Sequence, residues 1–265
     1  MDNPFHELQK IAKQVIEADR LLAGDLLAPG KDISSSLMAQ DGKSGEAESG
    51  KEERKIIIEP PKLRKMTPQA KKKQEELEAI GQEVRSCTRC GLCRTRTNTV
   101  LGEGNPDADI VFIGEGPGAE EDKQGRPFVG RAGELLTKMI AAMGLSRDDV
   151  YITNVVKCRP PGNRAPLIDE VEACWDYLVR QLKIISPKII VALGNPATHA
   201  LLNTTVGITR LRGQWQSLPI LDPALAGIKV MPTYHPAFLL RQYTQENRKK
   251  VWSDLQKVMK ELQLG

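Results

Sequence analysis

The chain has few aromatic residues, few histidines and no long apolar segment. Phe, Trp and Tyr make up 4% of its 265 residues, and it contains three histidines. No stretch approaches the roughly 18 consecutive apolar residues that a membrane-spanning helix needs, so we do not expect a membrane protein. The N-terminus lacks the basic and apolar segments of a secretory signal, which predicts a cytoplasmic protein.

Length, charge and cysteine content leave several classes of function open. A chain of this length suffices for one domain of ordinary size with additional segments. Its net charge of +4 and pI of about 8.7 are compatible with binding to nucleic acid but do not establish it. In a reducing cytoplasm, its five cysteines indicate metal binding before disulfide bonds.

Composition divides the chain into three segments. Residues 1–27 carry apolar residues at helical spacing and are expected to form an amphipathic helix, either a docking element for an unknown protein or a solvated extension. Residues 28–74 are expected to be a disordered linker that leads into a charged helix starting near Thr67. Residues 75–265 are expected to form the folded domain of a monomer.

Short apolar runs alternate with helical patterns along the folded domain. This alternation is typical of a parallel sheet with helices on both faces. We therefore predict a three-layer α/β/α domain around a central four-stranded parallel sheet. The apolar runs are 109–114, 151–156, 188–193 and 229–234, and the helical stretches are 131–143, 167–185, 195–203 and 245–262.

Unusual residues lie at the end of each predicted strand. A glycine-rich turn at residues 114–118 follows the first strand, and Asn154 lies late in the second. A Gly-Asn pair at residues 194–195 follows the third strand, and His235 follows the fourth. Because ligands of such sheets bind beyond the carboxyl ends of the strands, we expect these loops to meet in one crevice.

The glycine-rich turn opens the segment GEGPGAEEDKQGRPFVG at residues 114–130. Its glycines let backbone N–H groups approach a planar ligand or a phosphate closely. Glu115 is the charged side chain inside the turn, and Phe128 is placed to lie across the mouth of a pocket. The alternative is a tight strand-to-helix connection with Phe128 in the core. Two more acidic residues in the same loop, Glu121 and Asp122, favour a functional role.

The cysteines suggest a metal site that joins distant parts of the chain. Cys87 and Cys90 form a Cys-x-x-Cys pair, whereas Cys158 and Cys174 lie far along the sequence. Four thiolates suit zinc or an iron–sulfur cluster, and their spacing leaves the metal open. Cys93 is the remaining cysteine. Burial of Cys158 and Cys174 as plain core thiols is less favoured, because the sequence around Cys158 is polar.

Taken together, these segments resemble the family 4 uracil-DNA glycosylases, the iron–sulfur type. The motifs occur in the family's order over about residues 85–262, which makes the resemblance specific. It implies a uracil-DNA glycosylase-like fold and an enzyme that hydrolyses uracil from single- or double-stranded DNA to start base excision repair, associated with the nucleoid. The matching segments are CTRC at 87–90, LGEGNPDADIVFIGEGPGAEEDKQGRPFVGRAG at 101–133, YITNVVKCRPPGNRAP at 151–166, Cys174, and HPAFLLR at 235–241.

The resemblance also implies a cofactor and a set of substrate contacts. It implies a [4Fe-4S] cluster on Cys87, Cys90, Cys158 and Cys174, with Cys93 not a ligand. The implied uracil pocket consists of Glu115, Gly116, Pro117, Phe128, Asn154 and His235.

Each pocket residue has an expected task. Phe128 would stack on an extruded uracil, and Asn154 would accept from its N3–H and donate to its O4. His235, as a neutral donor, would stabilise the charge that develops on the departing base. The group that activates water is open among Glu115, Glu121 and Asn163, of which Glu121 has the alternative task of excluding the methyl group of thymine.

DNA outside the pocket is expected to contact the loops around it. Arg159, Arg164 and Arg241 are candidate phosphate contacts. Leu239 and Leu240 are candidates to wedge into the vacated base position, or alternatively form the buried start of the last helix.

The sequence is also compatible with other functions of the same fold. Relatives that capture uracil-DNA covalently carry a His-containing insertion after the first motif, whereas here Gly130 runs directly into Arg131. A glycosylase with broader specificity for deaminated bases is a further alternative. A non-catalytic, replication-associated DNA-binding module is disfavoured by the presence of Asn154, His235 and Phe128.

Overall fold

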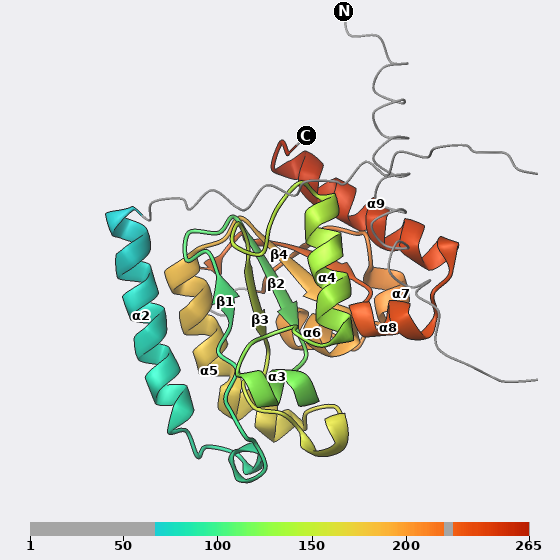
Figure 1. The fold of residues 1–265 in the computed structure, drawn as a ribbon. Coiled ribbons are helices and arrows are strands. Elements are labelled where there is room, and N and C mark those ends of the chain that lie inside the picture. The colour runs from blue at the N-terminus through green and yellow to red at the C-terminus, as the bar shows by residue number, and fades with distance from the viewer. Residues whose placement is uncertain (1–66, 220–224, 265) are drawn as a thin grey trace, which may run out of the picture.

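The computed structural model describes residues 67–219 and 225–264, and a six-stranded sheet forms the centre of this part (Figure 1). The helix predicted for residues 1–27 and the linker up to residue 66 lie outside the described residues. The strands are β1 (Glu103–Gly104), β2 (Ile110–Gly114), β3 (Tyr151–Asn154), β4 (Ile189–Leu193), β5 (Gln216–Ser217) and β6 (Lys229–Thr233), in the spatial order β1-β3-β2-β4-β6-β5.

The four inner strands are parallel, as the sequence predicts. Every residue of β2, β3 and β4 is buried, because helices cover both faces of the sheet. The register pairs Gly114 with Asn154 and Leu193 with Thr233, so the carboxyl ends of these strands lie level. The two edge strands, β1 and β5, are antiparallel and were not predicted, since two residues are too few to show a period.

Two layers of helices cover the sheet, which completes the α/β/α arrangement. Side chains of α4, α8 and α9 pack with Ile110 and Phe112 on one face, and side chains of α2, α5 and α6 pack with Val111 and Ile113 on the other. The helices are α2 (Pro68–Arg85), α3 (Ala119–Gln124), α4 (Arg131–Ala142), α5 (Ile168–Ile185), α6 (Gly194–Leu202), α7 (Ile208–Leu211), α8 (Pro236–Arg241) and α9 (Gln245–Glu261), with short 3-10 helices η1 (Gly91–Arg94) and η2 (Pro161–Asn163).

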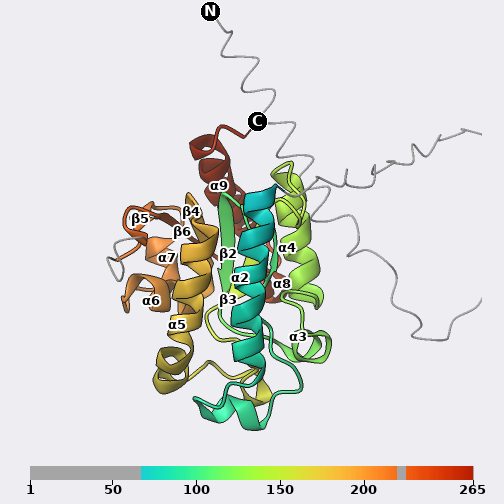
Figure 2. The ribbon, with the colours of Figure 1, turned by 90° about the vertical axis from the view of Figure 1, so that its left-hand side faces the viewer.

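Helix α2 belongs to the covering layer and lies beside α5 (Figure 2). It begins before the domain boundary predicted at residue 75, with the Thr67 hydroxyl accepting from the Ala70 N–H as the N-cap. Its charged composition hides an apolar stripe that includes Leu77, Ile80 and Val84. Within the described residues, no helix is long and apolar enough to cross a membrane.

Candidate active site

A cavity of about 590 Å³ opens at the carboxyl ends of the four parallel strands. Residues 115–118 after β2, Asn154 at the end of β3, residues 194–196 after β4 and His235 after β6 all line it. The structure thus brings together the loops that the sequence places in one crevice. Phe128, Glu121, Asn163, Arg164 and Arg241 also face this cavity.

Asn154 presents an unsatisfied acceptor at the base of the cavity. Its side chain is 2% exposed, and its Oδ1 atom has no hydrogen-bond partner. Gly114, its partner across the β2–β3 pair, makes room for it: a Cβ atom there would lie 2.5 Å from Asn154 Oδ1 and 2.5 Å from the Phe128 ring. Because a buried polar atom is costly without a partner, Asn154 is arranged to bind a donor from a ligand.

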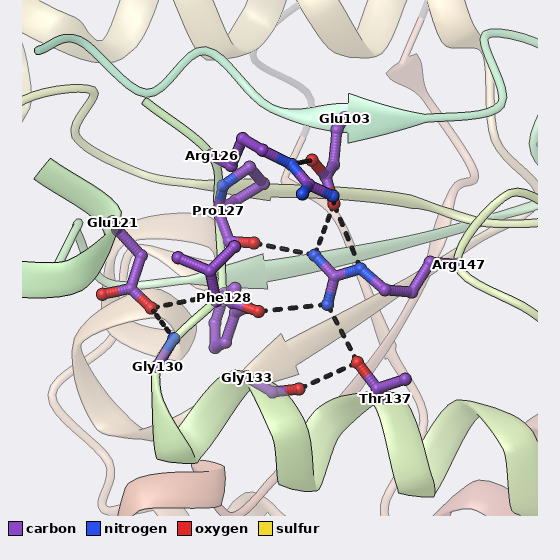
Figure 3. Close-up of polar contacts among 10 residues, drawn as sticks. Glu103, Glu121, Arg126, Pro127, Phe128, Gly130, Gly133, Thr137 and Arg147 are labelled. Atoms are coloured by element: carbon purple, nitrogen blue, oxygen red, sulfur yellow. Dashed lines mark hydrogen bonds and ion pairs between the residues drawn. The ribbon is translucent and has the colours of Figure 1, made fainter. Parts of the chain in front are cut away.

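Phe128 forms an aromatic wall beside Asn154. Its ring lies 5.7 Å from that of His235, centroid to centroid, at an interplanar angle of 32°. Its backbone adopts a left-handed conformation with φ of 51°, which is uncommon for a residue other than glycine. Glu121 and Arg147 hold this part of the loop from two sides (Figure 3).

His235 is held as a neutral ring by its position at a helix start. It is the N-cap of α8, and its Nδ1 atom accepts a hydrogen bond from the Ala237 N–H at 3.0 Å. That bond requires an unprotonated Nδ1, so a neutral ring carries its proton on Nε2. Burial, with a smaller effect of Arg241, lowers the pKa of His235 to about 4. His235 therefore offers a neutral N–H donor at physiological pH.

The three candidates for activating water differ in whether their side-chain oxygens already accept hydrogen bonds within the protein. Glu121 Oε1 accepts from the N–H groups of Val129 and Gly130 at 2.9 and 3.0 Å, so this carboxylate supports the loop. Asn163 Oδ1 accepts from Arg159 Nε at 2.8 Å. Burial raises the pKa of Glu115, which lines the cavity.

The candidate DNA contacts fall into two groups. Arg164 and Arg241 are exposed at the rim of the cavity, although Arg164 also forms an ion pair with Glu170. Leu239 is 1% exposed and belongs to the core on the α4 side, which favours its alternative assignment as a buried helix residue. Leu240 is only partly buried and stays a candidate to wedge into the vacated base position.

Four of the five cysteines lie in or against the hydrophobic core on the α5 side of the sheet. Cys158 and Cys174 are buried there, and Cys87 and Cys90 pack against the same cluster. Arg96 donates to Cys158 Sγ at 3.2 Å. Four cysteines from three segments of the chain, one of them next to a cation, fit a metal cluster by their chemistry. In the described residues, however, no three metal-ligating side chains are already grouped around one point.

Sequence reasoning missed Lys157, which supports Asn154 from behind. Its side chain is fully buried, and its Nζ donates to Thr153 Oγ1 at 2.8 Å and to the Asn154 carbonyl at 2.6 Å. Its backbone N–H contacts Cys174 Sγ at 3.3 Å. The sequence signal for a buried Lys157 is its position directly after the apolar residues 155–156. Because lysines are almost never buried, this position does not by itself predict burial.

Comparisons with known proteins agree with this fold and site. The family model of the uracil DNA glycosylase superfamily matches residues 101–256. The type-4 uracil-DNA glycosylase of Thermotoga maritima is 50% identical over 186 residues, which cover 70% of this chain and 94% of that protein. The enzyme of the same name from Archaeoglobus fulgidus is 48% identical over 190 residues, covering 69% of this chain and 92% of that protein.

The chain therefore belongs to the uracil DNA glycosylase superfamily. Within that superfamily it groups with the type-4 uracil-DNA glycosylases. A type-5 uracil-DNA glycosylase from Pyrobaculum aerophilum is more distant, at 34% identity over 149 residues that cover 51% of this chain and 63% of that protein.

Proposed function

We propose that this DNA glycosylase extrudes uracil from DNA into the cavity and hydrolyses its N-glycosidic bond. The observation that carries the proposal is the buried, unpartnered Asn154 Oδ1 next to the Phe128 ring. Together they offer one hydrogen-bonding edge and one stacking face, which suits a flat base with a donor on its edge. The type-4 relatives are named as enzymes that act on uracil in DNA.

Asn154 would select uracil by the order of donors and acceptors on the base. Its oxygen would accept from uracil N3–H, and its amide group would donate to O4. Cytosine presents the opposite order, so it would leave buried polar groups unpaired. Phe128 would stack on the face of the base and hold it in the plane of Asn154.

His235 would assist the departure of the base. Cleavage of the N-glycosidic bond leaves negative charge on uracil, and a fixed neutral donor directed at O2 lowers that barrier. The bond from Ala237 to Nδ1 fixes the ring so that Nε2–H is the group available for this task. A charged imidazolium is not needed, because the leaving group accepts a hydrogen bond without taking the proton.

Glu115 is our candidate for orienting the attacking water. It lines the cavity, and its side chain makes no hydrogen bond or ion pair in the described structure, in contrast to Glu121 and Asn163. The raised pKa of Glu115 makes it a stronger base than an exposed glutamate. Arg164 and Arg241, which line the cavity, would contact DNA phosphates, and the partly exposed Leu240 would be the wedge, with Arg159 supporting Asn163.

A [4Fe-4S] cluster would be held by Cys87, Cys90, Cys158 and Cys174, as expected for an enzyme of this type. When bound, it would join the segment after α2 to the segment after β3 and to α5. Its role would be structural, because none of these cysteines lines the cavity.

The test of the function is an excision assay on otherwise identical oligonucleotides. Full-length protein should release uracil from single- and double-stranded DNA and leave an alkali-labile site, with cytosine and thymine untouched. Equal release of hypoxanthine or xanthine would support the broader specificity instead, and a heat-stable protein–DNA adduct would support covalent capture. Binding to DNA without cleavage would refute the proposal.

Asn154→Asp should slow uracil excision and admit some cytosine, because an aspartate alters the hydrogen-bonding pattern that faces the base. Single-turnover rates on uracil and cytosine substrates measure both effects. Asn105→Asp is the matched control, since Asn105 Oδ1 only accepts from the Asp107 N–H, a bond that aspartate also makes. Unchanged rate and selectivity of Asn154→Asp would show that this side chain does not read the base.

His235→Ala should slow single-turnover cleavage by about 10²–10³, with little change in binding to a non-cleavable uracil analogue in DNA. His199→Ala is the control. His199 lies on α6, and its side chain hydrogen-bonds to the Val206 carbonyl in the loop that follows this helix. The pKa of about 4 means that His235 is neutral above that pH. The wild-type rate should therefore show no rise near pH 6.5, the ordinary value for histidine.

Substitution of any one of Cys87, Cys90, Cys158 and Cys174 by serine should lower the iron content and the thermal midpoint of the purified protein. Cys93→Ser serves as the control and should retain the iron. Iron analysis and visible absorption of anaerobically purified protein measure the result. Stoichiometric zinc without iron would contradict the cluster assignment.

A further inference from the structure

We infer that Arg147 is a positioning residue that orients the Phe128 ring for stacking. Its guanidinium group binds the carbonyls of Pro127 and Phe128 and is itself held by Glu103, and we call these contacts the Arg147 clamp. The inference rests on the proposed function, in which Phe128 contacts the base. Arg147 itself is not among the residues that line the cavity, so it would act through Phe128.

The first observation is the backbone of Phe128. Its φ of 51° lies in the left-handed region, which is uncommon for residues other than glycine and must be held by the surrounding structure. Helix α4 presses closely on the same residue, since a Cβ atom on Gly133 would lie 1.8 Å from the Phe128 carbonyl oxygen. The orientation of the ring therefore depends on contacts that hold this strained backbone.

The second observation is that one guanidinium group binds both carbonyls at this point (Figure 3). Arg147 Nη2 donates to the Pro127 carbonyl at 2.7 Å, and Nη1 donates to the Phe128 carbonyl at 3.1 Å. Nη1 also donates to Thr137 Oγ1 at 3.1 Å, and that hydroxyl in turn donates to the Gly133 carbonyl at 3.0 Å. Arg147 thus ties the loop to α4.

The third observation is the anchor behind the clamp. Glu103 Oε1 accepts from Nε and Nη2 of Arg147 at 3.1 and 2.6 Å, and both side chains are mostly buried, at 22% and 17% exposure. Glu103 lies on β1, opposite Ile152 of β3, so the clamp is fixed to the edge of the sheet. Arg126 also pairs with Glu103 but is 60% exposed.

The fourth observation is an opposing contact on the other side of the loop. Glu121 accepts from the N–H groups of Val129 and Gly130, whereas Arg147 donates to the carbonyls of Pro127 and Phe128. A carboxylate and a guanidinium therefore hold consecutive peptide groups from opposite sides (Figure 3). An ion pair that served stability alone would need no bonds to these carbonyls, which supports a positioning role.

The test is a double-mutant cycle between Arg147→Met and Phe128→Ala, measured as single-turnover uracil excision by the full chain. Arg147→Met alone should slow excision by about 10–100-fold, because a small misplacement of a binding group has effects of that size. In the Phe128→Ala background the same change should cost less than about 3-fold, since the residue acts through the missing ring. Affinity for a non-cleavable uracil analogue should follow the same pattern.

Two arginines serve as matched controls. Arg126→Met removes a second partner of Glu103 without touching the loop carbonyls, and Arg180→Met removes a similar two-bonded pair with Glu83 away from the cavity. Both should excise uracil within about 3-fold of wild type. Arg147→Lys keeps the charge but not the planar fork, so it should recover only part of the rate.

The outcomes separate this inference from the proposed function. A wild-type protein that does not excise uracil refutes the proposed function. If the wild type is active but Arg147→Met lowers the excision rate by the same factor with and without the Phe128 ring, the positioning role is refuted and the proposed function is not. If Arg147→Met fails to fold, as circular dichroism would reveal, Arg147→Lys replaces it in the cycle, and the same criterion of additivity decides.

Discussion

The parallel pairing of β2 with β3 determines the geometry of the whole site. It places Gly114 directly opposite Asn154, and the missing side chain of Gly114 leaves the space in which Asn154 Oδ1 and the Phe128 ring meet. The pairings of β2 with β4 and of β4 with β6 then bring His235 to the same edge. A shift of one residue in the β2–β3 register would turn Asn154 to the other face of the sheet.

Much of this arrangement could be predicted from the sequence, because the inner strands are short, mainly apolar runs and each ends at or just before an unusual residue. Phe128 and His235 stand out as aromatic residues next to proline, and Asn154 stands out as a polar residue within an apolar run. The fold rule that strand ends share one edge is sufficient to group them. The cysteine spacing likewise predicts one metal site, which stays a prediction, and it does not define the metal.

What the sequence did not reveal depends on contacts between distant segments. Arg147 and Glu103 are 44 residues apart in the chain, so no local pattern pairs them before folding. Leu239 and Leu240 are neighbours of the same type, and only the packing of α8 on the core distinguishes the buried one from the partly exposed one. Hydrophobic period defines elements well, whereas the pairing of side chains between elements requires the three-dimensional arrangement.

Lys157 shows how the cysteines can matter for a pocket that they do not touch. A buried ammonium group is costly unless its donors are satisfied, and here they bind Thr153 and the Asn154 carbonyl. Burial lowers the pKa of Lys157 to about 8, while the nearby thiols Cys174 and Cys158 act in the opposite direction. The same residue contacts Cys174 through its backbone. Lys157 thus links Cys174 directly to the strand end that carries Asn154, so the proposed cluster would restrain that strand end through this one residue.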